Sequence, residues 1–182
     1  MTVLNENESL VLIIDFQEKL INAAFNKNII ETKSIIMAKT ANILKIPTIV
    51  TEQYPKGLGG TIQPVKDSLG INCEYYEKTS FSALDNPIIS NAINKLHKKQ
   101  IVVFGIETHI CVSQTVNALI TNGYDVTVIS DACGSRAETE HIAGLQRIKE
   151  NGAHIITTEI ALFEWLKDSK HPNFKDIQSL IK

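Results

Sequence analysis

The sequence predicts a three-layer α/β/α sandwich, in which helices cover both faces of a central parallel sheet, formed as a single domain over residues 1–182. Short apolar runs alternate with segments of helical periodicity along the whole chain, which is typical of sheets built from strand–helix–strand units. Several runs contain no polar residue, as expected for strands buried on both faces. No break in composition marks a second domain, and the length is sufficient for one full core.

The apolar runs give the expected strands. The first run is continuously apolar and ends in the carboxylate of Asp15. Such a run favours a central strand, and the charge at its end favours the functional edge of the sheet. In chain order, the expected strands cover residues 10–15, 47–51, 74–78, 101–104, 125–130 and 153–157.

Helical periodicity and terminal signals give the expected helices. Pro87 lies near the first position of one helix, and Asn122-Gly123 and Gly152 end two others. The helices are expected at residues 28–44, 87–98, 111–120, 139–151, 158–167 and 172–181, with a partly helical connection at residues 16–26. Residues 52–72 are rich in turn signals and predict a long loop, a type of segment that often carries function.

The charge balance argues against two classes of partner. A net charge of −2 leaves no basic excess, so we expect neither nucleic acid nor a membrane surface as a partner. No apolar run approaches the roughly 20 residues of a membrane span. Residues 1–8 are polar and acidic, unlike a signal peptide, which predicts a cytoplasmic protein.

The three cysteines, Cys73, Cys111 and Cys133, are widely spaced and contain no C-x-x-C pair. This spacing argues against a disulfide framework or a structural zinc site and favours reduced thiols. Cys111 follows an apolar strand and opens a helical segment. At such a junction, unpaired N–H groups and the helix dipole stabilise a thiolate and can hold an oxyanion. The position suits a nucleophile, and equally a small buried residue.

Asp15, Lys78 and Cys111 all lie at the ends of expected strands, and in a parallel sheet these ends share one edge. Cys111 would be the nucleophile, and Asp15 would take its proton and later deliver it to a leaving amine. Lys78 would hold the carboxylate and lower the pKa of the thiol. Taken singly, each has a simpler interpretation: Asp15 as a helix cap, Lys78 as a surface lysine and Cys111 as an inert buried thiol. Only their joint placement predicts an active site.

Four motifs resemble those of the isochorismatase-like cysteine hydrolases, which include nicotinamidases, N-carbamoylsarcosine amidases and ureidoacrylate amidases. The resemblance covers nearly the whole chain and implies their Rossmann-like fold. Residues 51–59 and 171–175 look more specifically like the isochorismatase domain-containing subgroup. The four motifs are Asp15-Phe16-Gln17, Lys78-Thr79-Ser80-Phe81-Ser82, Gly105-Ile106-Glu107-Thr108-His109-Ile110-Cys111-Val112 and Asp131-Ala132-Cys133.

The resemblance implies a catalytic triad of Cys111, Asp15 and Lys78. It also implies a cis peptide bond between Ile106 and Glu107, and an oxyanion hole made by the backbone N–H groups of Glu107 and Cys111. The family commonly forms homo-oligomers, which we therefore expect here. Its nicotinamidases carry a histidine metal motif after the second strand, but this chain has no histidine between residues 45 and 96. We therefore expect no metal ion and no cofactor, and nicotinamide loses support as a substrate.

The sequence thus predicts a metal-independent cysteine hydrolase that cleaves a small amide or carbamoyl substrate through a thioester. Phe16, Tyr54 and Phe81 could form an apolar wall around the ligand and Thr108 could orient it, although plain packing explains each equally well. One alternative is a vinyl-ether hydrolase of the isochorismatase kind, whose chemistry needs a general acid rather than a thiol. Another is a non-catalytic binding module, or a redox-responsive protein that pairs Cys111 with Cys133.

Overall fold

The computed structural model describes residues 3–71 and 73–182 and confirms the predicted fold class. Over these residues the strands form one parallel sheet of six strands, in which the first strand is central. In chain order they are β1 (Ser9–Ile14), β2 (Thr48–Gln53), β3 (Cys73–Lys78), β4 (Gln100–Gly105), β5 (Asp125–Ile129) and β6 (His154–Ile156). Their order across the sheet is β3-β2-β1-β4-β5-β6.

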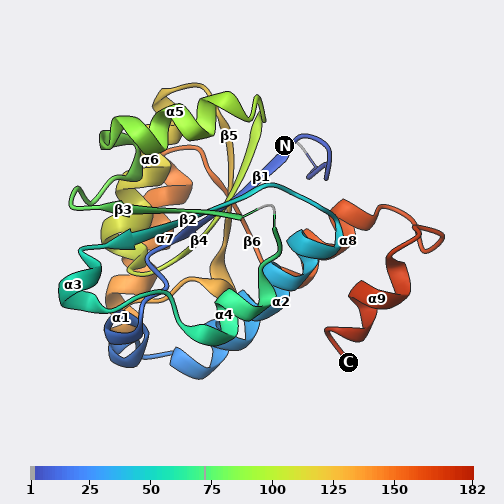
Figure 1. Ribbon diagram of the computed structural model, residues 1–182, viewed down its shortest axis with the longest axis horizontal. Helices are drawn as coiled ribbons and strands as arrows, with labels where there is room; N and C mark the ends of the chain where they lie inside the picture. The colour runs from blue at the N-terminus through green and yellow to red at the C-terminus, as the bar shows by residue number, and fades with distance from the viewer. Residues whose placement is uncertain (1–2, 72) are drawn as a thin grey trace.

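Helices cover both faces of this sheet. They are α1 (Glu18–Ala23), α2 (Lys27–Ile43), α3 (Pro55–Leu58), α4 (Gln63–Ser68), α5 (Pro87–Lys95), α6 (Ser113–Thr121), α7 (Glu138–Glu150), α8 (Thr158–Leu166) and α9 (Phe174–Ser179). Three short turns complete them: η1 (Ala83–Asp85), η2 (Thr108–Val112) and η3 (Ser130–Ala132). Figure 1 shows α2, α4 and α8 on one side of the sheet and α5, α6 and α7 on the other.

All six predicted strands are confirmed, each to within two residues at either end. Every residue of β1 and β4 is buried, which explains why these segments are nearly continuous apolar runs. The outer strand β3 instead exposes several side chains, and only its last residue, Lys78, is buried. A polar sequence can therefore form this edge strand.

The prediction of one long loop at residues 52–72 is wrong, because this segment contains α3 and α4. Each of these helices has a proline in its first turn, Pro55 and Pro64, where the fixed φ angle of proline suits helix initiation. In the sequence these prolines are interpreted as turn signals, so the two helices are not predicted. The last residue of the predicted loop, Asn72, lies outside the described residues.

Four predicted helix boundaries also need correction, two of them at the C-terminal helix, which covers Phe174–Ser179 rather than residues 172–181. Cys111 does not open an α-helix: it lies in the π-helical turn η2, and α6 begins two residues later at Ser113. The helix expected to end at residue 98 ends at Lys95, because His97 adopts a left-handed φ of 50° and turns the chain toward β4.

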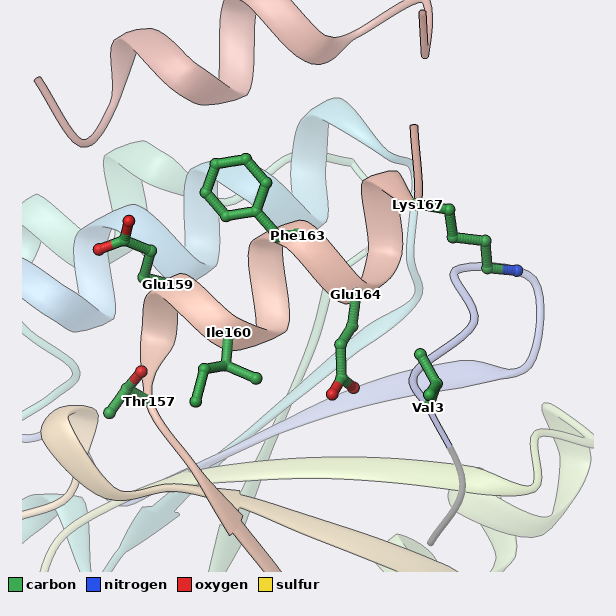
Figure 2. Close-up of a pocket in the computed structure, with 7 residues that line it drawn as sticks. All are labelled: Val3, Thr157, Glu159, Ile160, Phe163, Glu164 and Lys167. Atoms are coloured by element: carbon green, nitrogen blue, oxygen red, sulfur yellow. The ribbon is translucent and has the colours of Figure 1, made fainter. Parts of the chain in front are cut away.

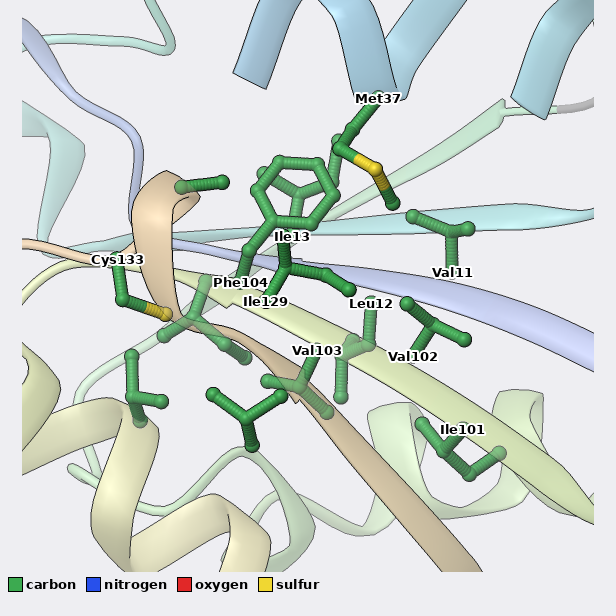
Figure 3. Close-up of a cluster of buried hydrophobic side chains, with 14 of the residues drawn as sticks. Val11, Leu12, Ile13, Met37, Ile101, Val102, Val103, Phe104, Ile129 and Cys133 are labelled. Atoms are coloured by element: carbon green, nitrogen blue, oxygen red, sulfur yellow. The ribbon is translucent and has the colours of Figure 1, made fainter. Parts of the chain in front are cut away.

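The core lies between the sheet and its two helical layers. Figure 3 shows Met37 of α2 close to buried side chains of the central strands, among them Val11 and Phe104. Cys133 belongs to the same cluster and is completely buried. Its surroundings are those of a packing residue.

Trp165 anchors α8 to the sheet. Its ring is 1% exposed, and its Nε1–H donates a hydrogen bond to Ser9 Oγ at 2.9 Å. The rings of Phe163 and Phe174 also lie 6.5 Å apart, which brings α9 against α8. The C-terminal segment therefore folds back on its own domain. Among the helices described, none has both the length and the apolar character needed to cross a membrane.

Candidate active site

The carboxyl ends of β1 and β3 bring two of the predicted site residues together. Lys78 Nζ lies 2.7 Å from Asp15 Oδ2, and both side chains are completely buried. β2 lies between these two strands, so the ion pair depends on the length of the lysine side chain. Asp15 follows β1 with a left-handed φ of 50°, which turns the chain as it leaves the sheet.

Further hydrogen bonds fix both members of the pair. The second carboxylate oxygen of Asp15 accepts a bond from Thr51 Oγ1 at 2.7 Å. The ammonium of Lys78 also donates to Gln53 Oε1 at 2.7 Å and to two backbone carbonyls, those of Ser80 at 3.2 Å and Phe81 at 3.3 Å. A buried charge pair is stable only when its remaining donors and acceptors are satisfied in this way.

Cys111 lies beside this pair, close enough for both charges to act on its thiol. Burial raises the pKa of its thiol to about 12, and the Asp15 carboxylate adds to the increase, while the charge of Lys78 opposes it. The sequence-based expectation of a lowered thiol pKa is therefore wrong. The side chain is 6% exposed, so desolvation outweighs the lysine. At neutral pH the resting form is the thiol.

Gln17 and Gln53 support the pair, and their roles were not predicted. The amide of Gln17 donates to the carbonyls of Gln53 at 3.0 Å and Gly59 at 2.5 Å, and its oxygen accepts from Gln53 N at 2.7 Å. Gln53 in turn holds Lys78. The only signal for Gln17 is its place in the Asp15-Phe16-Gln17 motif, and nothing in the sequence distinguishes Gln53.

The segment between β4 and η2 contains the predicted cis peptide bond and one of the two predicted oxyanion donors. The peptide bond between Ile106 and Glu107 is cis. The Glu107 carbonyl accepts bonds from Ile110 N at 3.1 Å and Val112 N at 3.3 Å, which start η2. Among the main-chain hydrogen bonds of the described residues, none has the Glu107 N–H as its donor. Burial would raise the pKa of the Glu107 carboxyl, but bonds from Arg136 and its charge lower it overall.

The four predicted substrate-binding residues divide into two pairs. Phe16 and Thr108 are completely buried, and the Thr108 hydroxyl bonds to Gly134 O at 3.0 Å and His141 Nδ1 at 2.9 Å. Neither side chain presents a surface to a ligand. Tyr54 and Phe81 are 56% and 53% exposed, and both adjoin Lys78 through backbone hydrogen bonds. Only this second pair is available to a substrate.

Two cavities are relevant to the search for a binding site, and only the smaller one adjoins Tyr54. One, of about 300 Å³, is lined by Tyr54, Lys56, Lys78 and their neighbours. Cys111 is not among the residues that line this cavity. Figure 2 shows a larger one, of about 730 Å³, beside α8, where Ile160 and Glu164 line it. It contains none of the predicted site residues.

The region after β2 offers no ligand set of the nicotinamidase kind. Glu52 instead accepts bonds from Thr61 N and Thr61 Oγ1, both at 2.7 Å, and so fixes the α3–α4 segment. Across residues 3–71 and 73–182, no three His, Cys, Asp or Glu side chains are grouped to hold a metal ion.

Comparison with known proteins agrees with this arrangement. The isochorismatase domain matches residues 9–160, most of the chain. The chain belongs to the isochorismatase family. Isochorismatase domain-containing protein 2 of Xenopus laevis is 38% identical, over 98% of this chain and 85% of that protein. This likeness confirms the resemblance to the isochorismatase domain-containing subgroup.

Two solved structures show the same fold. A Caenorhabditis elegans protein described as MAR1 ribonuclease is 36% identical, with a TM-score of 0.93 over 99% of this chain and 92% of that one. The Escherichia coli YcaC gene product, described as an octameric hydrolase of unknown specificity, is 23% identical, with a TM-score of 0.89 over 100% of this chain and 95% of that one. At this identity the second likeness concerns the fold alone.

Proposed function

We propose that this isochorismatase-family protein is a cysteine hydrolase that cleaves a small amide or carbamoyl compound through a thioester. The observation that supports it most is the completely buried Asp15–Lys78 ion pair beside the Cys111 thiol. Burying two charges costs desolvation free energy. Such a pair is retained where hydrogen bonds offset that cost or where the pair has a functional role. Here the pair lies beside a thiol, a side chain well suited to act as a nucleophile.

The elevated pKa of the thiol sets the order of the steps. Because the thiol is the resting form, Asp15 accepts its proton as the Cys111 sulfur attacks the substrate carbonyl carbon. The carbonyl oxygen becomes an oxyanion, which the N–H groups of Glu107 and Cys111 stabilise. The intermediate collapses to a thioester while Asp15 returns the proton to the leaving amine. Water then attacks the thioester, giving the acid or carbamate product and the free thiol.

Several features support the assignment of the oxyanion hole and of substrate size. The Glu107 N–H donates none of the main-chain hydrogen bonds of the described residues, as expected of a donor that serves a ligand. Tyr54 and Phe81 are the exposed aromatic residues next to Lys78, so we assign them to substrate contact. Cys111 is only 6% exposed, so a compact substrate fits better than a polymer.

Four competing functions have weaker support. Vinyl-ether hydrolysis has no use for the thiol that Asp15 and Lys78 surround. A redox pair of Cys111 with Cys133 would require a completely buried partner whose pKa burial raises to about 12. Ribonuclease activity, named for the C. elegans relative, would need contacts with phosphates, and the net charge here is −2. A non-catalytic module would leave the buried charge pair without a role.

We propose further that the reaction needs no metal ion or cofactor, since the histidine positions of the nicotinamidases are absent from the sequence. The whole of residues 1–182 would serve as one catalytic domain. Three unpaired cysteines suit a reducing compartment, so we place the enzyme in the cytoplasm. We also propose a homo-oligomer, the state in which the E. coli protein of the same fold is described.

The test is to trap the acyl-enzyme. The wild-type chain, incubated with a panel of small amides, carbamoyl compounds and short RNA, should hydrolyse an amide or carbamoyl member and show the acyl mass on the Cys111 peptide. Cys111→Ala should lose turnover completely and keep its thermal midpoint, while Cys73→Ala, at a more exposed cysteine, should keep both. Turnover by Cys111→Ala, or hydrolysis of RNA alone, would contradict the proposal.

A further inference from the structure

Arg136 makes three hydrogen bonds to one buried carboxylate, that of Glu107. Its backbone N and its Nε both donate to Oε1 at 3.0 Å, and its Nη2 donates to Oε2 at 2.7 Å. The Glu107 side chain is 11% exposed, whereas the Arg136 side chain is 63% exposed. An exposed arginine thus binds a buried glutamate in the bidentate geometry that suits a guanidinium and a carboxylate.

The loop that carries Arg136 is joined to the segment around Glu107 on both sides. Gly134 N donates to Gly105 O at 3.2 Å, before Glu107, and Thr108 N donates to Gly134 O at 2.8 Å, after it. The Glu107 carbonyl bonds to η2, and its side chain connects it to the loop through Arg136.

We propose that Arg136 is a positioning residue that holds the Glu107 N–H in the oxyanion hole. This inference rests on the proposed function and extends it to a residue outside the triad. The three bonds fix the Glu107 peptide from its side chain, so that its free N–H keeps one direction. The guanidinium also neutralises the Glu107 carboxylate, which would otherwise repel the negative charge that develops on the substrate oxygen.

If Arg136 has this role, its loss should affect two reactions of the Cys111 thiol differently. Acyl transfer from an ester or amide passes through an oxyanion and needs the hole. Alkylation by iodoacetamide displaces iodide at a saturated carbon and forms no oxyanion. A residue that acts only through the oxyanion hole should therefore affect the first reaction and spare the second, whereas general damage to the Cys111 environment should slow both.

The experiment measures both rates at Cys111 by mass spectrometry of its peptide, with p-nitrophenyl acetate and iodoacetamide as probes. Arg136→Gln should acylate about tenfold to a hundredfold more slowly, short of the full loss of one oxyanion donor, with alkylation unchanged within about twofold. Arg136→Lys should recover part of the acylation, since one ammonium replaces one of two contacts. The matched control is Arg147→Gln, at an exposed arginine of α7, and it should behave like the wild type.

Two results would overturn the inference: acylation of Arg136→Gln at the wild-type rate, or a parallel loss of acylation and alkylation. The thermal midpoint of each variant shows whether it is folded. If Arg136→Gln does not fold, the two rates of Arg136→Lys are compared with those of the wild type instead. A wild-type chain that alkylates but does not acylate at Cys111 would instead defeat the proposed function itself, and the inference with it.

Discussion

The two charges beside Cys111 act in opposite directions on its thiol. Asp15 raises the pKa and Lys78 lowers it, while burial, the largest effect, raises it to about 12. We therefore expect the rate of Cys111 alkylation by iodoacetamide to increase about tenfold per pH unit through the neutral and moderately alkaline range, because only the thiolate reacts. Mass spectrometry of the Cys111 peptide gives this rate at each pH.

Asp15→Asn serves as the partner measurement. Replacing the carboxylate with a neutral amide removes one cause of the elevated pKa, so this variant should alkylate faster than the wild type at neutral pH. Its acyl transfer should nevertheless fail, since the amide cannot accept the thiol proton. A wild-type rate that levels off near pH 7 would show a resting thiolate and contradict the assigned order of steps.

Residue types and strand ends were enough to predict that Asp15, Lys78 and Cys111 meet, because parallel strands bring their carboxyl ends to one edge. The direction of the thiol pKa could not be predicted in the same way. It depends on how deeply Cys111 is buried, which follows from the packing of η2. Arg136 was missed for a similar reason: its partner Glu107 lies 29 residues away and shares no motif with it.

At the level of elements, α7 packs unusually closely on η2 at Gly144. A Cβ placed there would lie 2.9 Å from the Cα and N of His109 and 3.0 Å from the backbone carbonyl carbon of Thr108. These are main-chain atoms of the nucleophile segment, and they cannot rotate aside. Because Gly144 has no Cβ, α7 can approach the segment that carries Cys111 this closely.

Gly144→Ala separates this packing effect from helix propensity. Alanine in a helix interior normally stabilises by about 1 kcal/mol relative to glycine. We expect the opposite sign, a net loss of about 1–3 kcal/mol in the free energy of unfolding from overpacking, measured by urea denaturation. Ala143→Gly, at the exposed neighbouring position, measures the propensity term alone. A more stable Gly144→Ala chain would refute the close contact.

Elements were predicted best where one physical signal dominates. Uninterrupted apolar runs located β1 and β4 correctly, because strands buried on both faces tolerate little else. The short helices α3 and α4 were missed because Pro55 and Pro64 indicate a turn and a helix start equally well. Only the tertiary contacts of residues 52–72 decide between these two outcomes.

For the whole molecule, we expect a homo-oligomer. Sedimentation velocity should give a mass that is a multiple of the 20.2 kDa of one chain, independent of whether Cys111 is intact. Cys111→Ala is therefore the control, since assembly should depend on surfaces rather than on the triad. A single species of one chain's mass at micromolar concentration would contradict the expectation.

The strand order has a consequence for how the chain folds during translation. β1 lies between β2, which follows it closely, and β4, whose first residue Gln100 pairs with Ser9. One hydrogen-bonding edge of the most apolar strand therefore stays open until more than half of the chain has been translated. Asp15 and Lys78 are both made before that moment and Cys111 just after it, so the growing chain has its charge pair before its nucleophile.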